Sequence, residues 1–134
     1  MSALALSAFD PTGRNIDNLV FAADFTTLRL NADLLVLSAC DTALGKNVPG
    51  EGLVGLRYIT LARGARAVVA SLWEVPDQAT SELMMAFYRS FLAGQTPVES
   101  ALSDAMRSML RGPRSDPSEW GAFTAALSGL SDLR

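Results

Sequence analysis

The sequence predicts an α/β fold in which a mostly parallel sheet is flanked by helices, and three observations support it. Residues 34–39 and 67–73 form continuous apolar runs of strand length, typical of strands that are covered on both faces of a parallel sheet. Stretches with helical spacing of apolar residues lie between and after these runs. The resulting order of strand, helix, strand, helix, helix, strand implies right-handed crossovers onto one sheet.

The chain before the first apolar run gives weaker signals. Alternating apolar and small residues at 3–7 predict a short strand, and Asp-Pro-Thr-Gly at 10–13 predicts a turn. We expect a short helix over about residues 19–28. Residues 41–50 contain two glycines and a proline, and this composition predicts a loop after the first apolar run.

Three further helices are expected. The first begins near Glu51 and stops at Gly64, which suits the position just past a helix end. The second runs from Asp77 to Gly94, with apolar residues at four-residue steps. Thr-Pro-Val-Glu at 96–99 has the form of a capping box that opens the third, which ends at Gly-Pro 112–113; a last strand is expected over 120–127.

Composition narrows the class of protein. The 134 residues, of which 49% are apolar, are expected to form one domain spanning 1–134, and a net charge of -3 argues against nucleic-acid binding. No run approaches the ~20 apolar residues that cross a bilayer, so no membrane span is expected. One cysteine and no histidine make a transition-metal site improbable, and we expect no metal and no cofactor. The absence of a disulfide framework or a basic signal segment favours the cytoplasm.

Cys40 is the candidate catalytic residue. It stands at the end of the 34–39 run, and α/β hydrolytic enzymes present their nucleophiles at the carboxyl end of a buried strand. A cysteine nucleophile normally needs a histidine to take its proton, and the chain contains none. The alternative interpretation is an inert buried cysteine.

Four stretches around this cysteine carry a resemblance. They are Leu-Ser-Ala-Cys-Asp-Thr-Ala-Leu-Gly at 37–45, Gly-Glu-Gly-Leu-Val-Gly-Leu at 50–56, Gly-Ala-Arg-Ala-Val-Val-Ala-Ser-Leu-Trp at 64–73 and Trp-Gly-Ala-Phe at 120–123. Together they resemble the CHAT family, whose caspase-like domains are often found beside TPR repeats. The resemblance implies a caspase-like fold, a protein or peptide substrate, and a TPR-containing segment or partner chain.

The resemblance also implies a cysteine endopeptidase of the caspase and separase kind, with Cys40 as nucleophile. In that family a His-Gly element precedes the cysteine, and in caspases the histidine lies ~50 residues upstream. Counting back from Cys40, this point falls before Met1. We therefore expect an N-terminally truncated domain, about the C-terminal two-thirds, that lacks its general base and is inactive as an isolated chain.

Three residues are candidates for substrate binding. Asp41 follows the nucleophile and Asp77 follows the second apolar run, and either carboxylate could bind a basic side chain next to the scissile bond. Trp73 could form a wall of the cleft. Structural roles compete with each: a turn for Asp41, a helix N-cap for Asp77 and a place in the core for Trp73.

Two other functions stay open. A non-catalytic interaction or scaffold module could keep this fold and its cysteine without a catalytic dyad. Gly-Glu-Gly-Leu-Val-Gly at 50–55, with Glu74 after the next strand, also fits a dinucleotide-binding fingerprint. That motif should follow its strand directly, whereas ten residues intervene here, so it is the lesser alternative.

Overall fold

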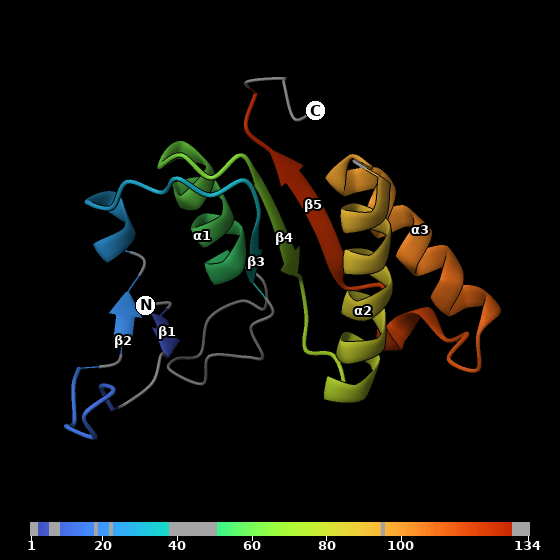
Figure 1. The fold of residues 1–134 in the computed structure, drawn as a ribbon, viewed down its shortest axis with the longest axis horizontal. Helices are drawn as coiled ribbons and strands as arrows, with labels where there is room; N and C mark the ends of the chain where they lie inside the picture. The colour runs from blue at the N-terminus through green and yellow to red at the C-terminus, as the bar shows by residue number, and fades with distance from the viewer. Residues whose placement is uncertain are drawn as a thin grey trace.

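A computed structural model describes residues 3–5, 9–17, 19–21, 23–37, 51–94 and 96–129 (Figure 1). Two sheets are present in this part of the chain. The strands are β1 (Ala3–Ala5), β2 (Leu19–Phe21), β3 (Leu35–Leu37), β4 (Ala67–Ser71) and β5 (Phe123–Leu127). The helices are α1 (Glu51–Ala62), α2 (Asp77–Gly94) and α3 (Val98–Arg111), with 3-10 helices η1 (Asp24–Thr26) and η2 (Pro117–Glu119).

The main sheet has the order β3-β4-β5, and its two strand pairs run in opposite senses. β3 and β4 are parallel and are joined through one helix, α1, which returns the chain to the starting end of the sheet. β4 and β5 are neighbours in the sheet and run antiparallel, because the chain passes through two helices between them (Figure 1). α2 carries the chain back and α3 reverses it again, so β5 starts at the end where β4 stops. The predicted α/β fold is confirmed, with a mixed sheet.

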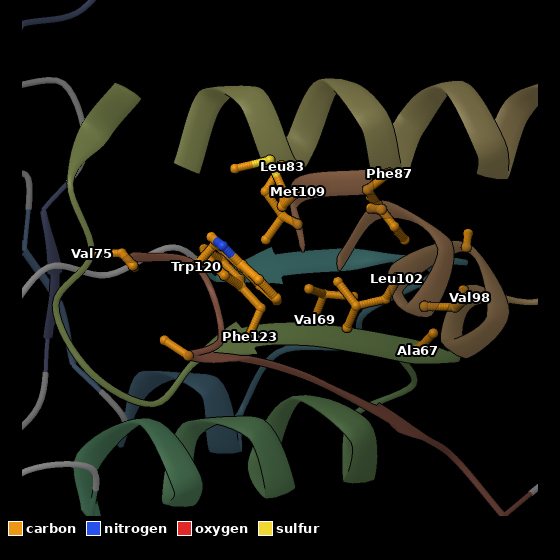
Figure 2. Close-up of a cluster of buried hydrophobic side chains, with 13 residues drawn as sticks. Ala67, Val69, Val75, Leu83, Phe87, Val98, Leu102, Met109, Trp120 and Phe123 are labelled. Atoms are coloured by element: carbon orange, nitrogen blue, oxygen red, sulfur yellow. The ribbon is translucent and has the colours of Figure 1, made fainter. Parts of the chain in front are cut away.

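Helices cover both faces of this sheet. Val68 and Ala70 of β4 belong to a cluster with Leu56 of α1, whereas Ala67 and Val69 belong to the cluster under α2 and α3. Every residue of β4 is buried, as expected for a central strand with two covered faces. The larger cluster fills the space between the sheet and the helix pair (Figure 2) and includes Leu83, Phe87, Leu102, Met109, Trp120 and Phe123.

Most predicted elements are present with small shifts at their ends. α2 has the predicted limits, and α1 ends just before Gly64, whose φ of +109° suits glycine. The turn at 10–13 is present, because the Asp10 carboxylate accepts bonds from the amides of Thr12 (2.9 Å) and Arg14 (3.0 Å). β4 stops at Ser71, two residues before its predicted end, and β5 begins three residues late, after η2.

Two predictions about local structure were wrong. No single helix covers 19–28. β2 pairs with β1 there, and η1 comes next in the chain. The Asp24 carboxylate of η1 accepts a hydrogen bond from the Phe21 amide at 2.7 Å. The capping box at 96–99 does not form either. Pro97 itself is the N-cap, because its carbonyl accepts the Ala101 amide at 2.9 Å, and no side chain caps α3.

Candidate functional site

The carboxyl edge of the parallel pair β3–β4 is where the sequence predicts the site. Leu37, the last residue of β3, is paired with Ala70, so both strands end at the same edge of the sheet. Cys40 and Asp41 lie outside the described residues, and the structure therefore does not test their predicted roles. What it describes at this edge is the link from β4 to α2, residues 72–76.

The link from β4 to α2 is anchored at several points. The Leu72 amide donates to the Ala122 carbonyl at 2.9 Å, which continues the contact between β4 and β5 past the end of β4. Val75 is buried in the cluster that contains Trp120. The backbone on either side of Trp73 is therefore tied to the segment that leads into β5.

Trp73 lies at the surface with 46% of its area exposed, so it is not a core residue. Its indole Nε1–H donates to the Ser118 carbonyl in η2 at 3.3 Å. This bond fixes the polar edge of the ring while a large part of the side chain stays open to solvent. An exposed, anchored aromatic ring at the edge of a sheet suits contact with another molecule.

Asp77 is exposed and is the first residue of α2. The Thr80 amide donates to the Pro76 carbonyl at 2.9 Å, so Pro76 occupies the N-cap and Asp77 lies in the first helical turn. The N-cap role considered for Asp77 is therefore not the one it has. A carboxylate in the first turn still lies favourably near the positive end of the helix dipole.

A cluster around Arg114, which sequence reasoning missed, joins α2 to η2. The Arg114 guanidinium contacts Glu82 through Nε and Glu119 through one Nη, each at 3.2 Å. Hydrogen bonds to Glu82, and then to Glu119, raise the pKa of Arg114. The Trp120 indole donates to the Arg114 carbonyl at 2.9 Å. No sequence spacing would have revealed a pair 32 residues apart, although Asp-Pro at 116–117 does signal the turn.

Comparison with known families agrees with the resemblance seen in the sequence. The family model for the CHAT domain matches residues 1–129. The chain belongs to the CHAT domain family.

Two similar relatives are both named tetratricopeptide repeat protein 28. The Mus musculus protein is 40% identical over 107 residues, 79% of this chain, and the Homo sapiens protein is 37% identical over 106 residues, 78% of this chain. The matched region is 4% of the length of each relative. This CHAT chain thus corresponds to a small part of long proteins named for their TPR repeats.

The dinucleotide fingerprint finds little support in this CHAT domain. The third glycine of such a motif allows a helix to pack closely on a strand. Gly55 is instead exposed on α1, and a Cβ there would meet nothing within 4 Å. Gly50 lies outside the described residues.

The described residues contain no group of three acidic, cysteine or histidine side chains able to hold a metal ion. Over the same residues, no helix is long and apolar enough to cross a bilayer.

Proposed function

We propose that this chain is the nucleophile-bearing part of a caspase-like cysteine endopeptidase, acting on a protein or peptide substrate in the cytoplasm. The observation that carries the proposal is that the one cysteine of a CHAT chain follows β3, the strand that runs parallel to the fully buried β4. In this proposal Cys40 is the nucleophile, and a TPR-containing segment or partner chain accompanies the domain.

Chain geometry supports a shared cleft. Cys40 is three positions after Leu37 in the chain, so their Cα atoms can be at most about 11 Å apart. Leu37 is paired with Ala70 of β4, and Trp73 comes three positions after Ala70, in the link that follows β4. We therefore assign Trp73 to the wall of the substrate cleft, and Asp41 and Asp77 to the binding of a basic side chain next to the scissile bond.

The general base must come from outside these 134 residues, since they contain no histidine. A thiol with a pKa of ~8.5 is only about 3% thiolate at pH 7. We propose that a His-Gly-bearing segment or partner completes the dyad, and that the isolated chain does not cleave peptides.

A scaffold role is the second candidate, and the absence of histidine favours it. In that case the CHAT fold serves protein–protein contact, and Cys40 is an ordinary thiol. The two functions differ in how Cys40 responds to a histidine-bearing segment.

The test is the pH dependence of alkylation by iodoacetamide. Because Cys40 is the only cysteine, the rate of mass gain reports this thiol alone. For the isolated chain we expect a midpoint near the ~8.5 of a free thiol. Co-expression with a His-Gly-bearing segment of a CHAT domain should lower the midpoint and produce peptide cleavage that Cys40→Ala abolishes.

The midpoint is more informative than a rate at one pH. If the pKa of Cys40 fell from ~8.5 to ~7, the thiolate fraction at pH 7 would rise about 16-fold. The weaker nucleophilicity of a less basic thiolate would leave a net gain of only about threefold. An unchanged midpoint with the segment bound, and no cleavage, would favour the scaffold role instead.

A further inference from the structure

Residues 72–76, which include Trp73, contact residues 118–122 at three points: before Trp73, after it, and through the indole itself. Leu72 bonds to Ala122 through the backbone, and Val75 is buried in the same cluster as Trp120. The Trp73 indole bonds to Ser118 between these two anchors. The position of Ser118 therefore governs where the edge of the indole lies.

The η2 turn is in turn fixed by its own contacts. The Asp116 carboxylate accepts the Ser118 amide at 2.9 Å and caps the turn. The Gly121 amide donates to the Pro117 carbonyl at 2.6 Å, and a Cβ on Gly121 would lie 2.7 Å from that oxygen, so only glycine allows this approach. Arg114 joins Glu119 to α2. The Ser118 carbonyl therefore belongs to a turn that is held by contacts before and after Ser118 in the chain.

We infer that Asp116 is a positioning residue for Trp73: by capping η2 it holds the Ser118 carbonyl where it accepts the indole N–H, and this bond keeps the exposed ring as a fixed wall of the substrate cleft. The role of the ring in substrate binding rests on the function proposed above. A ring already held in place loses little conformational freedom when a substrate side chain packs on it. Loosening η2 should therefore weaken substrate binding without changing the reactivity of Cys40.

The first arm of the test uses the chain itself, labelled with ¹⁵N. Its two tryptophans give two indole N–H signals, which Trp73→Phe assigns. Asp116→Ala should speed the exchange of the Trp73 indole proton with water several-fold and leave the Trp120 signal in place. Asp104→Ala is the matched control, because Asp104 is an exposed acid on α3 that pairs with Arg107. Unchanged exchange at Trp73 in Asp116→Ala would overturn the inference.

The second arm measures binding by labelling Cys40 with a peptidyl chloromethyl ketone that ends in arginine. The thiolate forms a C–S bond to the methylene carbon, and chloride leaves. At about pH 9 a free thiol is mostly ionised, so no general base is needed. We expect saturable labelling, with a half-saturating concentration that rises several-fold in Asp116→Ala and Trp73→Ala, but not in Asp104→Ala, at an unchanged limiting rate. Iodoacetamide rates should be equal in all four proteins.

The outcomes separate the two ideas. Labelling of the wild-type chain that never saturates would overturn the proposed cleft, and the role of Trp73 in it. Saturation that Asp116→Ala leaves unchanged would overturn the positioning role alone, with the proposed function still supported.

Discussion

Gly55 and Gly64 lie within and just past α1, and their surroundings differ: the site of Gly64 requires glycine, whereas that of Gly55 does not. Gly64 follows the end of α1 with a φ of +109°, and the Leu30 carbonyl occupies the place where its Cβ would be. Leu30 also donates its amide to the Arg63 carbonyl at 2.7 Å, so the two segments cannot separate easily. Gly55 lies inside α1, exposed and with open space around it.

The same substitution should therefore have opposite effects at these two sites. Gly64→Ala is expected to lower the free energy of unfolding by about 2 kcal/mol or more, because of its left-handed φ and the overlap with Leu30. Gly55→Ala should raise it by about 0.5–1 kcal/mol, since alanine is the better helix former. Urea denaturation measures both, and a shift of the same sign in the two variants would contradict this description.

Asp116 provides a pH-dependent prediction. Hydrogen bonds from the Ser118 amide, and then from its hydroxyl, hold the pKa of Asp116 below its ordinary value of 3.8. The stability contributed by this carboxylate is fully present above pH 3.8, the ordinary pKa, and is lost as the pH falls through the lower pKa of the folded state.

Asp116→Asn tests this linkage, because asparagine can still cap the turn but has no charge to lose. Between about pH 6 and about pH 2.5 the urea midpoint of the wild-type chain should fall more steeply than that of Asp116→Asn. The difference between the two curves isolates this group from the other carboxylates. Parallel curves would show that the carboxylate has the same pKa in the folded and unfolded chains.

At the scale of elements, the packing of α2 depends on Phe87. Its ring is fully buried and stacks on Phe91, with 5.7 Å between the ring centroids. The rings of Phe87 and Tyr88 meet in a T-shaped arrangement, with 5.1 Å between their centroids. Together with Leu83, the Phe87 ring lies in the cluster that joins α2 and α3 to the sheet (Figure 2). Phe87 thus lies in the core shared by α2, α3 and the sheet.

Phe87→Ala should cost about 3–5 kcal/mol, since it removes a large buried ring and leaves a cavity. A domain of this size is stable by only about 5–15 kcal/mol, so a loss of near-UV circular dichroism on mild heating is expected. Leu92→Ala, five residues further along α2 at a site with 75% exposure, is the control and should change stability by less than ~0.5 kcal/mol. Equal effects would contradict the packing of α2 described above.

The elements that the sequence predicts well are those determined locally. The limits of α2 follow from its apolar period and its terminal glycine, and β4 follows from an apolar run. The errors arise where distant contacts decide: β2 is a strand because it pairs with β1, and β5 pairs antiparallel with β4 in a sheet that was expected to be mostly parallel. No local pattern carries that information.

The candidate site divides in the same way. The sequence placed Trp73 at the end of a strand and Asp77 beyond it, and both lie past the end of β4, exposed. It did not reveal the partner of Trp73, because Ser118 lies 45 residues further along the chain. Nor did it reveal that Pro76, rather than Asp77, would accept the first helical hydrogen bond.

At the scale of the whole molecule, the described residues form a three-stranded sheet with a buried central strand and a small two-stranded hairpin. β4 is buried throughout and paired on both sides, whereas β1 and β2 form a separate two-stranded sheet (Figure 1). The hairpin leads into η1, whose Phe25 is buried in the α1 cluster. Two-stranded sheets are only marginally stable by themselves.

Amide hydrogen exchange should therefore be graded across the molecule. The slowest amides are expected in β4, where exchange requires opening of most of the fold, and the fastest strand amides in β1 and β2. Mass spectrometry of peptic fragments can separate the two regions. Protection of the hairpin equal to that of β4 would mean that both sheets open as one unit.

The antiparallel pairing of β4 and β5 also affects the order of events during synthesis. Ala67 begins β4, but its partner Leu127 is made 60 residues later. At ~5–20 residues per second, the ribosome needs roughly 3–12 s to supply it. Until then β4, the most buried strand of the sheet, can pair with β3 along one edge but has no partner along the other. A nascent chain with this topology is exposed to strand pairing with its neighbours for seconds, and a chaperone that binds extended apolar segments would act within that interval.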